Sequence, residues 1–359
     1  DAEKGRHSVG AGRNRKGWTA RTALNGGPGE AVVEGAEGTV LDGFVFREDA
    51  STVATVRVKR AMTLSRCLFE AGSGSCIDAW NAEDLVLRRL RFERMESSVY
   101  TPMIQLKGSP RFLVEDCLFL ENTGNPSLMS TQYSGDGRMN RVVFLRNALN
   151  SYLIYLLELE NESCQPVIAN SWFEDNPIVL ASLDDGPIFV NSVFKSNQGF
   201  LAMNGQDYEK SDADGEWEPE GEECEGEPCS GNSCPLPEVC PTTFVHCTFV
   251  GNKQPDALLF NMMGTHLNLT NSVLFDNASF LVSYFCDPPS AGHTLFQANP
   301  HFSGTGNLVG EPGFMGPGNV RPGAGSVLLN AGMDISALGV WRGHDGYCWA
   351  AARCAWRGV

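Results

Sequence analysis

The chain has 359 residues, of which 39 are glycine and 19% are charged, a composition typical of a turn-rich all-β protein. That length is sufficient for a sizeable buried core. The formal net charge of −16 argues against nucleic-acid binding, which normally needs a basic face. We also expect no membrane span, because no apolar run reaches the roughly 18 residues that a membrane helix requires.

Residues 1–34 are rich in Gly and Arg and show little periodicity, which predicts an N-terminal lead or cap. The first 21 residues hold six Lys or Arg against two acids, so this end is basic. The chain opens with DAEKGRHS and without a secretion signal, so we expect a processed product.

One short phrase recurs from residue 35 to residue 306. It consists of a small or apolar residue, any residue, an aromatic anchor, two variable residues and then Asn, as in DCLFLEN at 116–122. The anchors follow one another at 21 to 29 residues, with a single gap of 55. They are Phe46, Phe69, Phe92, Phe119, Phe144, Phe173, Phe194, Phe249, Leu274 and Phe296. The Asn residues three positions later are Asn122, Asn147, Asn176, Asn197, Asn252, Asn277 and Asn299.

These segments alternate with period two and are short, which predicts β-strands. One coil of strand and turn cannot bury its own inner face, whereas stacked coils can. Equivalent residues then form ladders, with Phe on Phe inside and Asn on Asn at the bend. Asn suits that place because it bonds to its copy and tolerates left-handed backbone. The sequence therefore predicts a single parallel solenoid of about eleven coils.

On these Phe and Asn ladders, the chain resembles the right-handed parallel β-helix proteins of the pectate-lyase-like superfamily. GSVLLNAGMDISALGV at 325–340 also resembles the closing segment of bacterial members. The resemblance implies an exported bacterial protein located outside the cell or at its surface. It implies no particular reaction, because the superfamily includes lyases, glycoside hydrolases and adhesins.

Residues 205–241 interrupt the repeat and read as an exposed, acidic, Cys-rich inserted loop. Residues 207–227 alone hold eleven acids and one Lys. Asp212, Asp214 and Glu216 stand at alternate positions as calcium-ligand candidates, although Trp217 occupies the place of the usual Gly. Diffuse attraction of cations by a charged loop is the alternative. No other cofactor is predicted.

The chain has 12 cysteines, and irregularly spaced clusters favour disulfides in an exported protein over a zinc site. Cys67, Cys117 and Cys247 differ, because each stands two residues before an anchor, where we expect a small inward side chain with a free thiol. Residues 307–359 read as a Gly/Pro-rich closing segment and a Cys/Trp-rich C-terminal cap. The disulfide candidates are Cys224, Cys229, Cys234, Cys240, Cys348 and Cys354.

The search for catalytic residues yields none. Acids such as Glu115, Asp116 and Glu174 flank the anchors, but Arg141 and Arg146 belong to no recognisable base motif. Asp184–Asp185 resembles the acid pair of polygalacturonases, yet the companion phrases of that family are absent.

The residue before each anchor should point outward, and eight of these ten residues are apolar. Such a stripe suggests a cover, by the chain itself or by a partner. We therefore expect a non-catalytic structural or adhesive protein that assembles with itself or binds another surface protein or a polysaccharide. The alternative is a polysaccharide lyase or glycoside hydrolase. The interface candidates are Leu68, Leu118, Val143, Trp172, Val193 and Val273.

Overall fold

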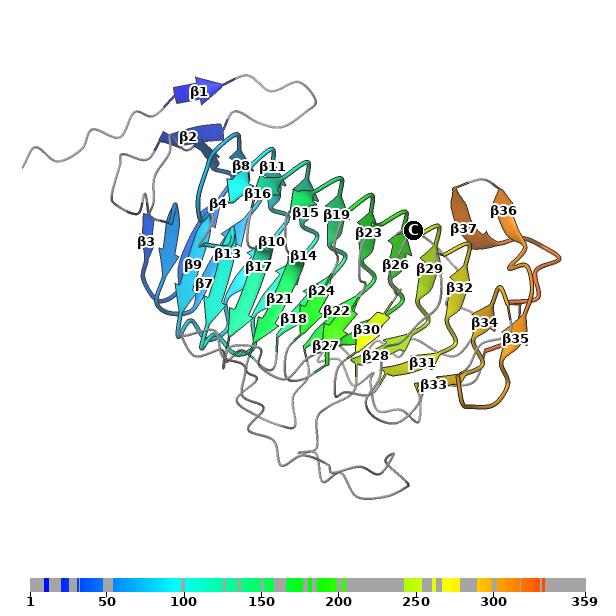
Figure 1. Cartoon of the computed structure of the whole chain (residues 1–359). Coiled ribbons are helices and arrows are strands. Elements are labelled where there is room, and N and C mark those ends of the chain that lie inside the picture. Colours follow the sequence, from blue (N-terminus) through cyan, green and yellow to red (C-terminus); the bar gives the residue numbers. More distant parts are fainter. Residues whose placement is uncertain are drawn as a thin grey trace, which may run out of the picture.

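The computed structural model describes residues 10–12, 21–25, 31, 33–47, 54–97, 101–124, 127–132, 134, 137–149, 152–157, 166–176, 180–182, 186–198, 202–204, 242–253, 260–262, 267–277, 289–298, 302–316, 318–329 and 331–332. These residues form short strands that wind into an elongated solenoid (Figure 1). Apart from two antiparallel pairs, neighbouring strands run parallel, so the predicted all-β parallel β-helix is confirmed. Within the described ranges there is no helix that has the length and apolarity to cross a membrane.

The anchors lie in a sheet of 13 strands, which we call the anchor sheet. Its strands, in spatial order, are β1 (Gly10–Gly12), β2 (Arg21–Asn25), β5 (Val45–Arg47), β8 (Leu68–Glu70), β11 (Arg91–Glu93), β15 (Leu118–Leu120), β19 (Val143–Leu145), β23 (Trp172–Glu174), β26 (Val193–Lys195), β29 (Thr248–Val250), β32 (Val273–Phe275), β34 (Leu295–Phe296) and β35 (Leu308–Val309).

The strands that run directly before the anchors form a sheet of ten, the preceding sheet. They are β4 (Thr39–Asp42), β7 (Met62–Ser65), β10 (Val86–Arg88), β14 (Leu113–Glu115), β18 (Arg138–Asn140), β22 (Val167–Ala169), β25 (Ile188–Val190), β28 (Thr242–Val245), β31 (Leu267–Thr270) and β33 (Ser290–Gly292).

A third sheet of nine strands closes the coil. Its strands are β3 (Val33–Gly35), β6 (Val56–Val58), β9 (Ile77–Trp80), β13 (Ile104–Lys107), β17 (Ser127–Gln132), β21 (Tyr152–Leu157), β24 (Leu180–Ser182), β27 (Ala202–Asn204) and β30 (Phe260–Met262). Two small sheets complete the described structure. They consist of β12 (Glu96–Ser97), β16 (Thr123–Gly124) and β20 (Ala148–Leu149), and of the hairpin β36 (Phe314–Gly316) and β37 (Asn319–Pro322).

The predicted count of about eleven coils matches none of the long sheets, which have 13, 10 and 9 strands. Among the described residues, the difference arises at the ends, where a turn of chain contributes a strand to fewer than three sheets. At one end β2 pairs in parallel with β5, and at the other end β35 pairs in parallel with β34.

The core is a column of stacked phenyl rings. From Phe46 to Phe249, successive anchor rings lie 4.7–5.0 Å apart and within 16° of parallel. This spacing is the distance between neighbouring strands, so the register of the sheet itself stacks the rings. On the preceding sheet, Phe189 and Phe244 stack at 4.8 Å and contact the column edge-on. All of these rings are fully buried.

A second column consists of the buried Asn side chains. Each Nδ2 donates to the Oδ1 of the next Asn at 2.7–3.1 Å, from Asn122 through to Asn277. The expectation that these Asn residues adopt left-handed backbone is wrong. The residue just before each Asn has positive φ, for example Glu121 at 55° and Arg146 at 51°. The preceding residue makes the bend, which leaves the Asn side chain pointing inward.

A third column lies two residues before the anchors. Cys117 and Cys247 are buried there as free thiols, as predicted, and Cys67 is buried at the same place. Ser171 and Ser192 occupy the same place and donate to the carbonyl two residues earlier, at 2.8 and 3.0 Å. Burial raises the pKa of Cys117 and of Cys247 to about 12. Of the remaining cysteines, Cys76 is buried and the others lie outside the described residues.

Candidate interaction surfaces

The outer face of the anchor sheet carries the predicted apolar stripe. In each anchor-sheet strand from β8 to β26, the central anchor is buried and the residue on either side of it is half-buried. On the four strands β15, β19, β23 and β26, six of the eight outward residues are apolar and form a surface that we call the anchor-face patch, and the other two are Glu174 and Lys195. The patch consists of Leu118, Leu120, Val143, Leu145, Trp172 and Val193.

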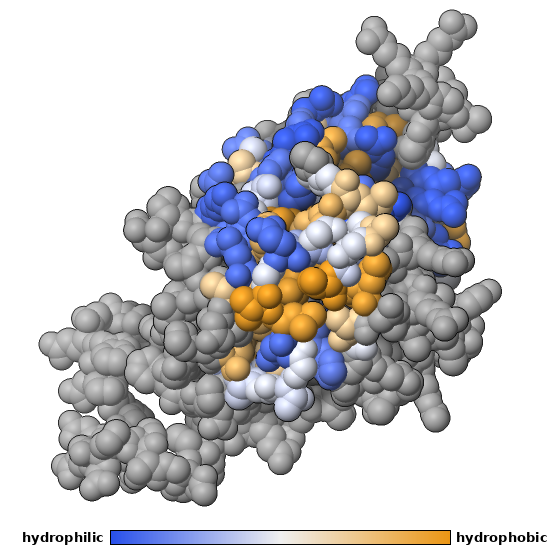
Figure 2. Space-filling model, turned by 90° about the vertical axis from the view of Figure 1, so that its right-hand side faces the viewer, coloured by the Kyte–Doolittle hydropathy of each residue, from blue (hydrophilic) through white to orange (hydrophobic). Residues whose placement is uncertain are grey.

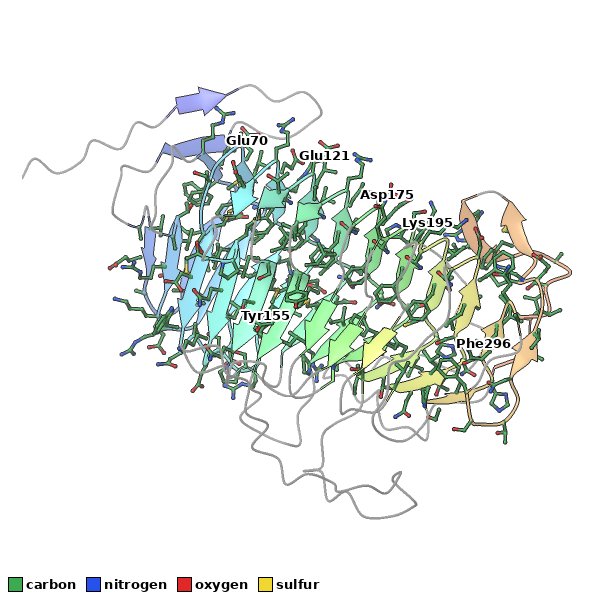
Figure 3. All side chains as sticks on the ribbon, viewed as in Figure 1. Glu70, Glu121, Tyr155, Asp175, Lys195 and Phe296 are labelled. Atoms are coloured by element: carbon green, nitrogen blue, oxygen red, sulfur yellow. The ribbon has the colours of Figure 1, made fainter. Side chains whose placement is uncertain are left out.

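Ion pairs border the anchor-face patch along the stack. Arg91 contacts Glu93 on one side, and Lys195 Nζ lies 2.6 Å from Glu174 Oε1 on the other. Trp172 Nε1 also donates to Glu174 Oε2 at 2.8 Å. In Figure 3, Glu121, Asp175 and Lys195 are labelled along this margin of the solenoid. One ion pair thus lies on β11, next to the patch, and the other lies on β23 and β26, beside Trp172 and Val193.

The stripe continues under the closing segment of the chain. Thr248, Val273 and Leu295 are only 1–2% exposed, although they occupy outward positions. Phe314 of β36 contacts the Phe275 ring at one margin of the sheet. At the other margin, Ala331 O lies 3.3 Å from His293 Nδ1. The closing segment thus crosses this face, and it removes Val273 from the surface that a partner can reach.

The C-terminal end of the solenoid exposes apolar side chains. Of the six large hydrophobic residues that are exposed among the described ones, Val309, Met315, Val327 and Leu329 lie here, at 46–65% exposure. Figure 2, which views this end, shows hydrophobic atoms gathered across its middle. Among the described residues, this end of the stack therefore presents apolar side chains to its surroundings.

A surface that the sequence did not indicate lies on the outer face of the third sheet. Trp80 is 48% exposed on β9, and its Nε1 donates to Asp78 Oδ1 at 2.6 Å. The next strand, β13, places Gln105 beside Asp78 and Lys107 beside Trp80. Lys107 Nζ lies 5.1 Å from the centre of the Trp80 ring. The indole thus contacts one acid through its N–H group and one cation across its ring face.

The same face continues with tyrosines. Tyr155 on β21 is aligned with Ser130 on β17, and its ring stacks on Tyr152 at 5.4 Å. Tyr155 is labelled on this sheet in Figure 3. Three strand spacings and an offset of two residues along the strand separate Trp80 from Tyr155, a distance of about 16 Å. We call the surface formed by Asp78, Trp80, Gln105, Lys107, Gln132 and Tyr155 the third-face strip.

The charges of the third-face strip nearly cancel. Arg57 Nε lies 4.0 Å from Asp78 Oδ2 and its Nη1 lies 3.3 Å from Glu34 Oε1. Partial burial raises the pKa of Asp78, against the opposing effects of the Trp80 hydrogen bond and of Arg57. The strip therefore combines aromatic faces with amides and paired charges, rather than a field of one sign.

The acids once considered for catalysis lie in ion pairs between neighbouring coils. Glu115 lies within 2.7 Å of both Arg88 and Arg141, and Asp116 lies 2.6 Å from Arg141. No three His, Cys, Asp or Glu side chains converge as metal ligands within the described ranges. The calcium candidates Asp212, Asp214 and Glu216, the six disulfide candidates, and Asp184–Asp185 lie outside the described residues.

The ion pair of Arg141 and Asp116 should make the stability of the fold depend on pH. The hydrogen bonds from Arg141, aided by its charge, hold the pKa of Asp116 below its ordinary value of 3.8. A carboxyl group with a depressed folded-state pKa stabilises the fold above its unfolded-state pKa, and this contribution is lost as the pH falls through the folded value. We expect Arg141→Gln to raise the pKa of Asp116, as measured by NMR titration of the carboxyl carbon.

Both partners are partly exposed, so the free energy of unfolding should change by less than about 1 kcal/mol. Arg146→Gln is the matched control, because Arg146 pairs with Glu121 instead. An Asp116 pKa that stays unchanged in Arg141→Gln would show that the ion pair is not formed in solution.

Sequence reasoning missed the third-face strip because it followed the anchors, and the third sheet has no fixed motif. Alternation in IDAW at 77–80 and IQLK at 104–107 was the available signal, because it marks Asp78, Trp80, Gln105 and Lys107 as outward.

Comparisons of this chain with protein-family models, with curated proteins and with solved structures found no match. The surfaces described above are therefore the basis for assigning a function.

Proposed function

We propose that this chain is a non-catalytic structural or adhesive β-helix of the extracellular space or cell surface, and that its third-face strip binds a neutral polysaccharide. The observation that supports this most is Trp80, an indole that is 48% exposed and fixed in orientation by Asp78 and Lys107. The location is supported by the resemblance of the Phe and Asn ladders in the sequence to those of exported bacterial β-helix proteins.

The chemistry of the strip favours a sugar chain. An aromatic face offers a flat, weakly polar surface to the C–H groups of a sugar ring. Planar amides such as Gln105 and Gln132 both donate and accept hydrogen bonds, as hydroxyl groups require. Trp80 and Tyr155, about 16 Å apart on parallel strands, can contact separate residues of one extended chain. The net charge of −16 disfavours acidic polysaccharides.

We expect Trp80→Ala to weaken binding of a neutral polysaccharide by about tenfold or more, because exposed aromatic anchors dominate such contacts. Affinity electrophoresis in gels that contain neutral or acidic polysaccharides measures this directly. Trp172→Ala is a closely matched control, since Trp172 also points outward and donates to an acid two residues away. Equal weakening by both substitutions, or binding of acidic chains alone, would contradict the assignment.

Self-association is a second candidate function, favoured by the anchor-face patch. Six apolar side chains lie on four adjacent strands, with one ion pair beside them, so two copies related by a twofold axis can bury them together. Light scattering at physiological salt should then give a multiple of the mass of one chain. Leu145→Glu should restore the monomer, whereas Val86→Glu on the preceding sheet should not. A monomeric wild-type protein would rule this function out.

A further inference from the structure

The apolar stripe of the anchor sheet changes its exposure abruptly along the stack. The residue before the anchor is half-buried on β15, β19, β23 and β26, the four strands of the anchor-face patch. On the next three strands the corresponding residues are Thr248, Val273 and Leu295, which are only 1–2% exposed. A cover therefore lies on the stripe from β29 onward.

Described residues of the closing segment reach both margins of this part of the sheet. We call residues 312–316, 318–329 and 331–332 the strap. The Phe314 ring lies 6.4 Å from the Phe275 ring of β32, edge-on to it, and Figure 1 shows the hairpin of β36 and β37 beside β32. At the other margin, Ala331 O lies 3.3 Å from His293 Nδ1. Between these two contacts the strap crosses the outer face of the sheet.

The strap has strand pairing of its own. β36 and β37 form a separate two-stranded sheet, and Gly323 N donates to Gly313 O at 2.7 Å beside it. Val320 of β37 is only 8% exposed, whereas its neighbour Asn319 is exposed. Gly310 and Gly313, with φ of 139° and 62°, connect the strap to β35. A body with its own pairing and a glycine connection can be lifted from the sheet while the ladders of the solenoid stay intact.

The strap begins where the anchor-face patch ends. Gly318 lies beside β26, since a Cβ added to it would be 3.9 Å from Lys195 Nζ. Lys195 belongs to the last strand of the patch, and the next two strands, β29 and β32, add Val250, Val273 and Phe275 to the outward face. The stripe is thus continuous from β15 to β34, and the strap crosses its second part.

Lifting the strap would nearly double the length of the available stripe. At the usual strand spacing, four strands extend over about 19 Å and seven strands over about 34 Å. A lasting interface buries about 800 Å² on each partner, which favours the longer stripe over the patch alone. The occupant that fits is a second copy of the same stripe. Its side chains repeat at the same strand spacing, so two stripes related by a twofold axis match along their whole length.

We propose that the strap is a displaceable cover that competes with a second copy of this chain for the anchor-sheet stripe. With the strap in place, a partner can reach only the patch from β15 to β26. With the strap lifted, two copies join face to face along β15 to β34. This contact extends the self-association candidate and rests on the same face. The mass of the wild type tests the patch alone, whereas the change of mass on release of the strap tests the strap.

Phe314→Asp should release the strap, because it removes the ring contact with Phe275 and places a charge against the sheet. In hydrogen–deuterium exchange of the dilute full chain, peptides from 312–329 should exchange faster than in the wild type, while the anchor column stays protected. Light scattering over a range of concentrations should then give a dissociation constant at least tenfold lower than that of the wild type. Met315→Asp is the matched control, because Met315 is the next residue of β36 and is 65% exposed. It should leave both measurements unchanged.

Val273→Glu added to Phe314→Asp should reverse the association, because Val273 joins the contact only where the strap has been lifted. His293→Ala removes the bond to Ala331 O and is the second release variant, which serves if Phe314→Asp also loses protection in the anchor column. A released strap with the mass of the wild type would overturn the proposal. So would a strap that stays protected in both release variants, because it would then be a fixed part of the fold. Association that Val273→Glu leaves intact would place the contact on another surface and would overturn it as well.

Discussion

Phe144→Ala should lower the free energy of unfolding by about 3–5 kcal/mol, which is the usual cost of deleting a fully buried phenyl ring. The Phe144 ring lies 4.7 Å from Phe119 and 5.0 Å from Phe173. Both neighbours are fixed by strand pairing at their own level, so they cannot collapse into the space. Urea unfolding followed by circular dichroism measures the change.

Val143→Ala is the control, because Val143 is the outward neighbour of Phe144 on β19 and is half-buried. It should cost less than about 1 kcal/mol. Equal losses from the two substitutions would mean that β19 does not direct Phe144 inward, which contradicts the register of the anchor sheet.

Asn147→Ala should cost about 3–5 kcal/mol, through unmade hydrogen bonds rather than through lost volume. Asn147 Nδ2 donates to Phe119 O at 3.1 Å, and its Oδ1 accepts from Asn122 N at 3.2 Å. Removing the amide leaves this buried carbonyl and N–H group without those partners. The same urea experiment applies, with the loss appearing as a lower midpoint.

Asn140→Ala provides the comparison, since Asn140 is a half-buried outward residue on β18 that bonds only to other side chains. Its loss should stay below about 1 kcal/mol because water replaces those bonds. If Asn147→Ala is as mild as Asn140→Ala, the Asn column is not a main source of stability.

The fold could be predicted because its determinants recur. The anchors occur in nearly every coil, and strand pairing alone brings Phe119, Phe144 and Phe173 into one column. The repeat predicted the bend at the Asn, but the residue before it makes the bend. Glu121 and Arg146 adopt positive φ there, although Glu and Arg are not residue types that mark a left-handed turn in a sequence. A repeat fixes which positions align, but it does not show which of two adjacent residues makes the turn.

The surfaces were less predictable. The anchor-face patch follows from the repeat, because the residue beside an inward anchor must point outward. Burial of Val273 does not follow from it, because that depends on where the closing segment crosses the sheet. The third-face strip combines Asp78 and Trp80 with residues of β13 and β21, which lie 25 to 77 residues further along the chain and meet them only through sheet register.

The most direct test of the account is size-exclusion chromatography with light scattering of the wild-type protein mixed with a neutral polysaccharide of narrow length distribution. The account predicts a complex heavier than either component, and a polysaccharide whose mass is unchanged after it is separated from the protein. Absence of a complex would contradict the binding role of the third-face strip. A polysaccharide that becomes shorter on incubation would contradict the non-catalytic role and identify the chain as a polysaccharide-cleaving enzyme.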